Sequence, residues 1–289
     1  MIRRRKFRLR LPSRTLVLGE RTLVMGVLNV TPDSFSDGGA FFNPEIAVAR
    51  ALEIEKAGAD ILDIGGESTR PGAAAISVDE ELGRVMPVLN ALRGRLGIPI
   101  SIDTRKAAVA EAAVAAGAEI INDVSALRFD PALGETARRR RVPIILMHMR
   151  GEPMTMQKQR FARNVFRDVT SGLRAAIARA RRARIAKSLI VLDPGIGFGK
   201  SYRQNFELLA HLPRLAALGY PLLVGTSRKA FLGAALGSAA SPAPAERRIW
   251  ATAATVTSAI LNGAHIVRVH DVAEMTQVAR IADAVAAEL

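Results

Sequence analysis

Eight short apolar runs, each ending at or just before a polar side chain, recur along the chain with stretches of helical patterning between them. The polar residues are Asn29, Asp63, Asp103, Asn122, His148, Asp193, Thr226 and Arg268. Several runs are β-branched and apolar throughout, which is typical of strands covered on both faces of a parallel sheet. Strands that alternate with helices in this way predict an α/β fold in which the polar strand ends meet at one mouth.

We predict a (β/α)8 TIM barrel with its active site at the C-terminal ends of the strands, because such barrels commonly reach the 289 residues of this chain as one domain. The alternative is an open doubly wound sheet, which usually carries a glycine fingerprint after its first strand. Here Asn29-Val30-Thr31-Pro32-Asp33 follows the first run instead. The expected strands lie at 23–28, 60–64, 98–102, 119–122, 142–147, 188–192, 221–225 and 264–269.

Residues 7–22 alternate between apolar and polar side chains, which predicts a small β-hairpin ahead of the barrel. We therefore expect a basic N-terminal extension or hairpin over residues 1–22 and a single barrel domain over residues 23–289. The basic N-terminus lacks the apolar block of a secretory signal, because Arg8, Arg10 and Arg14 interrupt it. An organellar presequence is the alternative.

Basic residues exceed acidic ones by 41 to 27, which gives a formal net charge of +14. Such a charge can indicate nucleic-acid binding. The excess is concentrated at 3–14, 138–141 and 174–187, and the last two segments have helical patterning without interleaved aromatic residues for base stacking. We therefore expect solvated outer helices and no nucleic-acid partner. A positive field that attracts anionic substrates is the functional alternative.

The chain has no cysteine, which excludes disulfides and thiolate metal sites and fits a reducing compartment. No apolar stretch approaches the roughly 20 residues that a membrane-spanning helix needs. We expect a cytoplasmic protein without a membrane partner.

Three aspartates, Asp63, Asp103 and Asp193, each follow an apolar run, and Asn29 and Asn122 end two others. Any one of these aspartates could simply cap the next helix. Together, however, their burial is costly unless positive groups or hydrogen-bond donors offset it. A ring N–H beside an exocyclic amine can donate two parallel hydrogen bonds to a carboxylate, so a guanidine-like heterocycle is an expected ligand. Cations that could share this task are Lys229, Arg268 and His270.

Arg268 lies near the end of the last expected strand, and His270 follows two positions later. If the backbone stays extended, the two side chains point to the same side. With the segment 68–72, which follows the second strand, they predict a clamp for phosphate or carboxylate. The alternative for Arg268 is an ion pair with Asp271 or with a barrel carboxylate.

The segment 195–201 resembles a phosphate-binding loop, but that pattern requires glycine at position 194, where this chain has Pro194. We predict a tight turn that brings the backbone close to a ligand, with Phe198 as an apolar wall. The polar segment 31–39 is either a lid or an ordinary loop. No His or Cys cluster has zinc spacing, but Mg²⁺ is often bound by few protein oxygens together with substrate phosphates. Asn29 is the expected protein ligand.

Several of these segments closely resemble signatures of the dihydropteroate synthase family. The first two, Gly26–Gly39 and Gly65–Gly72, are highly specific. The others gain weight from their order and spacing, and together the matches cover roughly residues 23 to 275. These shorter matches are Ile121–Asp123, Leu146–Met149, Leu192–Gly195, Gly225–Lys229 and Val267–His270.

The resemblance implies a TIM-type barrel, usually a homodimer, that condenses 6-hydroxymethyl-7,8-dihydropterin diphosphate with 4-aminobenzoate to give 7,8-dihydropteroate and diphosphate. Mg²⁺ would be the cofactor, held by Asn29. The implied catalytic residues are Asp103, Asn122, Asp193 and Lys229. By the same resemblance, the pterin would contact Asp103, Asn122, Met147, Asp193, Phe198, Gly225 and Lys229. The diphosphate would contact Asn29, Thr69, Arg268 and His270. The aminobenzoate site, where sulfonamides would compete, would comprise Phe35, Thr69, Arg70, Pro71, Phe198 and Lys229.

The chain departs from the family pattern in places that touch none of these residues: Thr226 stands where many relatives carry methionine, and Ala230 where a serine is frequent. Arg105-Lys106 replaces a continuation that often reads Ser-Lys-Pro or similar. Two other functions stay open at this point. One is a pterin-dependent methyltransferase acting on methyltetrahydrofolate, which would not need the diphosphate clamp. The other is a non-catalytic paralogue, which would have lost catalytic side chains.

Overall fold

The predicted barrel is confirmed by the computed structural model, which describes residues 3–31, 43–69, 72–152, 154–156 and 160–288. Among these residues an eight-stranded sheet runs in the order β8-β7-β6-β5-β4-β3-β10-β9, with each neighbouring pair parallel. A parallel bridge between Leu192 and Leu222 joins the first and last strands of that order and closes the ring. The strands are β3 (Leu23–Asn29), β4 (Ile61–Gly65), β5 (Ile100–Asp103), β6 (Ile120–Asp123), β7 (Ile144–Met147), β8 (Ile190–Asp193), β9 (Leu223–Val224) and β10 (Ile266–Val269).

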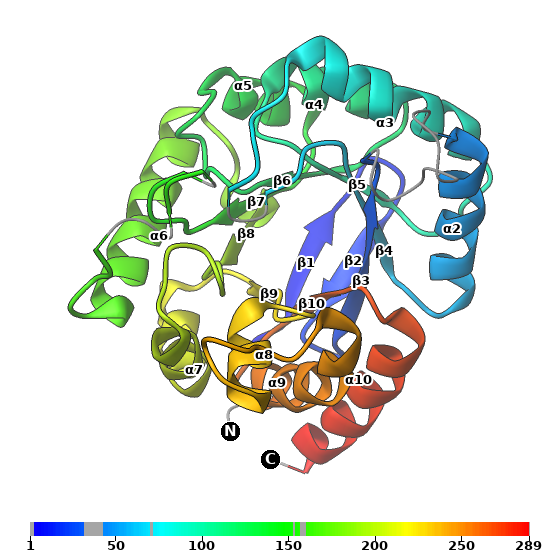
Figure 1. Cartoon of the computed structure of the whole chain (residues 1–289). Helices are drawn as coiled ribbons and strands as arrows, with labels where there is room; N and C mark the ends of the chain where they lie inside the picture. The colour runs from blue at the N-terminus through cyan, green and yellow to red at the C-terminus, as the bar shows by residue number, and fades with distance from the viewer. Residues whose placement is uncertain (1–2, 32–42, 70–71, 153, 157–159, 289) are drawn as a thin grey trace.

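Helices form a ring outside these strands (Figure 1). Local signals start several of them: Asn43, Ser77 and Asn164 each accept a hydrogen bond from a backbone N–H of the first helical turn. The α-helices are α2 (Pro44–Lys56), α3 (Val78–Leu92), α4 (Ala107–Ala115), α5 (Ala132–Arg140), α6 (Val165–Arg182), α7 (Tyr202–Ala210), α8 (Ala230–Leu236), α9 (Ile249–Leu261) and α10 (Val272–Ala287), with 3₁₀ turns η1 (Lys187–Leu189), η2 (Leu212–Leu218) and η3 (Ala245–Arg248).

The alternation of side chains along each strand separates two cores. One core fills the layer between the strands and the helices, and the other fills the inside of the barrel. Within the barrel, apolar side chains such as Met25, Ile61 and Val191 occupy the part nearest the strand starts. The next inward positions, two residues further along, are polar on most strands. The sequence therefore builds an apolar floor with a polar chamber above it.

The predicted hairpin is also confirmed, and it closes the barrel at the end where the strands begin. Its strands β1 (Phe7–Arg10) and β2 (Thr15–Leu18) pair antiparallel, and in Figure 1 this hairpin lies across the ring. Leu9 and Leu18 are fully buried in the same cluster as the inner residues of the barrel strands. Arg4 then ties the N-terminal segment to α10, because its guanidinium pairs with Asp283 and donates to Thr22.

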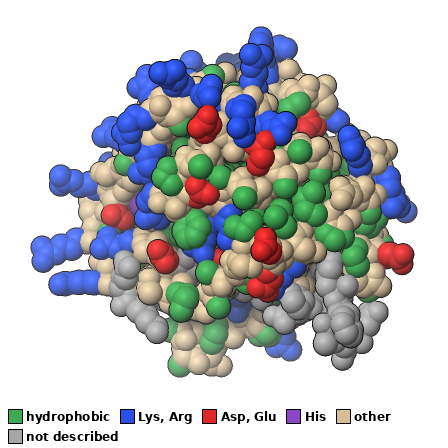
Figure 2. Space-filling view, turned by 90° about the horizontal axis from the view of Figure 1, so that it is seen from above, with side chains coloured by type: hydrophobic (Ala, Val, Ile, Leu, Met, Phe, Trp, Pro, Cys, Tyr) green, Lys and Arg blue, Asp and Glu red, His purple; other side chains and the backbone are tan. Residues whose placement is uncertain are grey.

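The charge on the outside is dispersed. On the face shown in Figure 2, Lys and Arg side chains spread along the upper and left margins, and Asp and Glu lie between hydrophobic side chains. The basic run Arg138–Arg140 is in the last turn of α5, where cations interact favourably with the helix dipole. In the described part of the chain, no helix is both long enough and apolar enough to cross a bilayer.

We expect Leu9→Ala to lower the free energy of unfolding by about 2–5 kcal/mol, because it leaves a cavity in a fully packed part of the core. Val17→Ala on the same hairpin is the matched control, since Val17 is 37% exposed, and its effect should stay within about 0.5 kcal/mol. Urea unfolding followed by circular dichroism measures both. Equal losses in the two variants would show that the hairpin does not plug the barrel.

Candidate active site

A buried guanidinium lies at the centre of the polar chamber. Arg268 on β10 donates through Nε to Asp63 Oδ2 at 2.7 Å and through Nη2 to Asp103 Oδ2 at 2.8 Å. Asn122 on β6 donates from Nδ2 to the same Asp63 oxygen at 3.1 Å. Residues that the sequence places 205 positions apart are thus joined across the barrel. The structure brings together Asp103, Asn122 and Arg268, as predicted.

Around Arg268, the chamber has more negative than positive charge. Asp63 is completely buried, and its second oxygen, Oδ1, has no hydrogen-bond partner among the described residues. Burial raises the pKa of Asp103 to about 7, an effect that Arg268 opposes and Asp63 reinforces. Because two carboxylates share one guanidinium, one negative charge is left over. Either protonation of a carboxyl group or binding of a ligand rich in N–H donors would offset it.

Lys229 and Asp193 stand on the neighbouring side of the chamber. Asp193 ends β8, and its Oδ1 accepts a hydrogen bond from the Gly195 backbone N–H at 2.6 Å. Lys229 Nζ donates to the Ile196 carbonyl at 2.5 Å and lies 4.0 Å from the centre of the Phe198 ring. Burial lowers the pKa of Lys229 to about 7, with Asp193 acting in the opposite direction. This amine can therefore hold or release a proton near neutral pH.

An apolar wall adjoins these polar groups. Met147, at the end of β7, packs in a small buried cluster with Val124, Met149 and Met156, and Phe198 lies against it. Met147 and Asp193 are register partners on adjacent strands, so the sulfur side chain and the carboxylate lie at the same level of the barrel. A flat heterocycle could rest on this wall while its polar edge meets the carboxylates.

The turn at 195–199 is as tight as the sequence predicts. A side chain at Gly195 would place its Cβ 1.9 Å from the His148 carbonyl oxygen, so only glycine fits. Sequence reasoning missed the residue that holds this turn. Lys200 is almost fully buried and donates to the carbonyls of Gly195 at 2.7 Å and Phe198 at 3.0 Å. In a phosphate-binding loop this lysine would contact a ligand. Here its amine instead holds the backbone of the turn, including the carbonyl of Phe198.

The residues predicted to bind the diphosphate lie at the same mouth of the barrel, but one of them, His270, differs from the prediction in its charge. Asn29 ends β3 opposite Gly65 in the β3–β4 register, and Thr69 follows β4 by four residues. His270 directly follows β10 by one residue, with Nδ1 3.0 Å from Ser227 Oγ. Burial and the nearby Arg268 lower the pKa of His270 to about 3. His270 is therefore neutral at pH 7 and does not supply the positive charge that the sequence interpretation assigned to it.

The structure also decides which of the two possible ion pairs Arg268 forms. It pairs with barrel carboxylates and not with Asp271, which pairs with Arg228 instead. The guanidinium thus lies deeper in the barrel than a surface clamp would. Gly225 follows β9, beside the Cβ of Arg268. Three predicted aminobenzoate residues, Phe35, Arg70 and Pro71, lie outside the described residues, as does 32–39 of the predicted lid.

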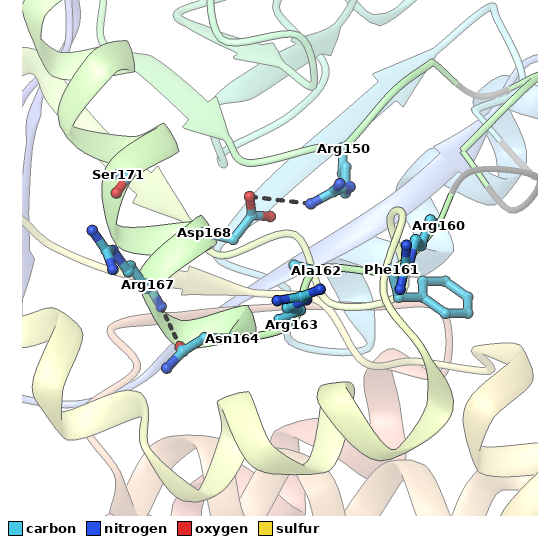
Figure 3. A pocket seen from close by; sticks show the side chains of 9 residues that line it. All are labelled: Arg150, Arg160, Phe161, Ala162, Arg163, Asn164, Arg167, Asp168 and Ser171. Carbon is cyan, nitrogen blue, oxygen red and sulfur yellow. Dashed lines mark hydrogen bonds and ion pairs between the residues drawn. The ribbon is translucent and has the colours of Figure 1, made fainter.

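A separate cavity of about 530 Å³ lies over the start of α6 (Figure 3). Figure 3 shows Arg150 reaching toward Asp168, and these two side chains form an ion pair at 3.4 Å. Predicted site residues within the described ranges do not line it. Arginines dominate its charged lining residues, so the cavity is positively charged. The lining residues are Arg150, Arg160, Phe161, Ala162, Arg163, Asn164, Arg167, Asp168 and Ser171.

Comparison with known proteins places this chamber in a family. A family model described as "Pterin binding enzyme" matches residues 25–270. A dihydropteroate synthase from Synechocystis is 49% identical over 266 residues, covering 92% of this chain and 91% of the relative. The chain belongs to the dihydropteroate synthase family. As a member of this family of transferases, it is an enzyme.

Solved structures of dihydropteroate synthases share the fold. The Xanthomonas albilineans enzyme, solved with 4-aminobenzoic acid, matches with a TM-score of 0.89 at 46% identity and covers 97% of this chain and 98% of its own. The Yersinia pestis enzyme, solved with a sulfonamide drug complex, also has a TM-score of 0.89, at 42% identity, and covers 98% of this chain and 100% of its own. The resemblance predicted from the motifs is confirmed over nearly the whole chain.

The raised pKa of Asp103 predicts a pH dependence of stability. Between pH of about 4 and 7 the folded site binds a proton more tightly than the unfolded chain does, so the free energy of unfolding should fall as pH rises through this window. Asp103→Asn cannot ionise and should flatten this slope. Urea unfolding of both proteins across the window measures the difference. Parallel curves would contradict the assignment.

Proposed function

We propose that this chain condenses 6-hydroxymethyl-7,8-dihydropterin diphosphate with 4-aminobenzoate, giving 7,8-dihydropteroate and diphosphate. The observation that carries the proposal is the buried cluster in which Asp63 and Asp103 share the guanidinium of Arg268. One oxygen of Asp63 has no hydrogen-bond partner among the residues that the structure describes. The names of the relatives and the 4-aminobenzoic acid in a solved relative support the same conclusion.

The pterin fits the chamber through its guanidine-like edge. Its ring N–H and exocyclic amine would donate to Asp193 and Asp103, and the amide of Asn122 can both donate and accept. Lys229 can hydrogen-bond a ring acceptor from the opposite side. Met147 and Phe198 would contact the ring face, since both border the apolar cluster at that level. Such a ligand would supply N–H donors to the Asp103 carboxyl, whose pKa is raised by burial and by neighbouring carboxylates.

The chemistry begins with cleavage of the C–O bond between the pterin CH2 and diphosphate. The bonding electrons leave with the diphosphate, so positive charge develops on the pterin. The carboxylates of Asp103 and Asp193 stabilise that charge, and such preorganised groups typically contribute several kcal/mol each (about 3–4). The nitrogen of 4-aminobenzoate then attacks the CH2 to form the C–N bond, and the resulting ammonium loses a proton to solvent water. Because this aromatic amine is already neutral at pH 7, it needs positioning more than a general base.

The departing anion would be held by Arg268, His270, Thr69 and Asn29. Neutral His270 can donate a hydrogen bond but carries no charge, which leaves Arg268 as the cation of this set. The protein would supply few ligands to a divalent ion. The described residues contain no group of three or more His or acidic side chains around a common point. Mg²⁺ characteristically binds in this way, with substrate phosphates supplying most oxygens. Asn29 would add one ligand, and the ion would neutralise diphosphate charge.

The aminobenzoate would lie between Phe198, Lys229 and the segment after β4. Thr69 is the last described residue of that segment, and Arg70, Pro71 and Phe35 complete the proposed site by family resemblance. Sulfonamides would compete for the same place.

The reaction itself is tested by diphosphate release in a coupled assay, with and without 4-aminobenzoate, in the presence of Mg²⁺. Release that depends on the amine is the expected result, together with dihydropteroate detected by mass spectrometry. Absence of product under these conditions would assign the chain to a non-catalytic branch of the family.

Removing either key charge should suppress turnover without unfolding the chain. We expect Asp103→Asn and Lys229→Ala each to lower kcat/KM by about 10² to 10³, since each removes a group placed to meet charge or orient the pterin. Glu53→Gln on α2, in an exposed pair with Arg50, serves as the control. Near-normal turnover in either site variant would remove that residue from the mechanism.

We also propose that the chain forms a homodimer through an aromatic face on α7, α8 and α9, which lie side by side in Figure 1. Trp250 is 80% exposed there, and Leu236, Tyr202 and Phe206 are 40–53% exposed. Large exposed apolar patches of this kind mark association surfaces.

A charge placed in this face should separate the subunits. We expect Trp250→Glu to elute as a monomer in size-exclusion chromatography with light scattering. Ile281→Glu on α10, at a residue that is 69% exposed, is the matched control and should leave the dimer intact. A monomeric unmodified chain, or a dimer that tolerates Trp250→Glu, would reject this interface.

A further inference from the structure

A second buried charge cluster lies outside the catalytic chamber, behind the segment that follows β4. Glu67 accepts hydrogen bonds on both carboxylate oxygens, from Arg105 Nη2 at 2.8 Å and from Lys106 Nζ at 2.7 Å. Lys106 Nζ also pairs with Glu81 on α3. The four side chains are at most 8% exposed. The cluster therefore joins three separate parts of the chain in a site that is largely shielded from water.

The charges in this cluster balance, which explains why it can be buried. Two glutamates face one arginine and one lysine, and Glu81 lies in the first turn of α3, where the helix dipole favours a carboxylate. The Arg105 guanidinium stacks 4.0 Å over the Phe129 ring. A buried pair of this kind contributes little net stability but makes the loss of one partner costly. Its value lies in fixing geometry.

The cluster links two segments of the catalytic site. Arg105 and Lys106 come two and three residues after Asp103, and Glu67 comes two residues before Thr69. Close packing reinforces the link: a side chain at Gly66 would place its Cβ 2.8 Å from Val85 and 3.1 Å from Glu81 Cγ. The segment 65–69 is thus held against α3 and against the tetrapeptide 103–106. It leads directly into residues 70–71, which lie outside the described part.

We propose that Glu67 is a positioning residue that, through Arg105 and Lys106, fixes the segment 65–69 at the angle required to bind 4-aminobenzoate. The proposal rests on the proposed function, because it assigns a role in binding the second substrate. It separates the two halves of the site. The pterin carboxylate Asp103 is held independently by Arg268 and by the β5–β6 register with Asn122. Removing the ion pairs of Glu67 should therefore weaken the binding of 4-aminobenzoate and leave the binding of the pterin unchanged.

The test compares steady-state kinetics and pterin binding in Glu67→Gln. We expect the KM for 4-aminobenzoate to rise about tenfold or more while kcat changes less than about threefold, because the segment still reaches its bound position at high substrate. Binding of 6-hydroxymethylpterin, followed by calorimetry, should stay within about twofold of the unmodified chain. Glu53→Gln, in the exposed pair with Arg50 on α2, should change none of these quantities.

Arg105 provides a second pair of variants in case Glu67→Gln does not fold. Arg105→Gln should raise the KM for 4-aminobenzoate in the same way, and Arg105→Lys, which keeps the cation facing Glu67, should restore it. An unchanged KM in both Glu67→Gln and Arg105→Gln would overturn the proposal. So would an equal loss of pterin binding, because that would indicate a general structural defect. If the unmodified chain forms no dihydropteroate, the proposed function fails instead.

Discussion

The sharing of one guanidinium by two carboxylates inside the barrel is the constraint on which the site depends. Arg268 can reach Asp63 and Asp103 together only if β10, β3, β4 and β5 are neighbours in the ring, as the sheet order places them. Three such charges in a low-dielectric interior tolerate little displacement, because an unpaired buried ion costs several kcal/mol (about 3–5 on loss of one partner). The same arrangement leaves a surplus of hydrogen-bond acceptors. The chamber is thereby prepared for a ligand that is rich in N–H groups.

Much of this architecture follows from local rules that can be applied to the sequence alone. Apolar runs ending in polar residues predicted the strands to within about two residues, which is the usual uncertainty at element ends. Parallel strands then required Asp103, Asn122, Asp193 and Arg268 to meet at one mouth, and they do so. The hairpin was predictable because Phe7, Leu9 and Leu11 alternate with Arg8 and Arg10, so that one face of this strand could be buried.

Other features depend on tertiary environment and could not be predicted from spacing. Arg268 pairs with carboxylates that form no other ion pair with a described residue. Because Arg228 already forms an ion pair with Asp271, Arg268 faces the barrel interior. The neutrality of His270 comes from burial beside Arg268, which the sequence does not show. The sequence predicts the tight turn at 195–199, but not that the buried amine of Lys200 donates to the backbone carbonyls of that turn. Glu67, Arg105 and Lys106 lie in or next to recognised motifs, yet only their burial reveals that they join one another.

The position of the first barrel strand has a consequence for synthesis of the protein. One edge of β3 pairs with β4 soon after both have been made, but its other edge pairs only with β10, where Ile266 lies opposite Leu23. The ring therefore stays open on the ribosome until β10 has emerged, and an unpaired strand edge attracts other extended chains. Nascent chains of this protein should thus be a substrate for holding chaperones until β10 has emerged, and release should coincide with the pairing of β3 and β10.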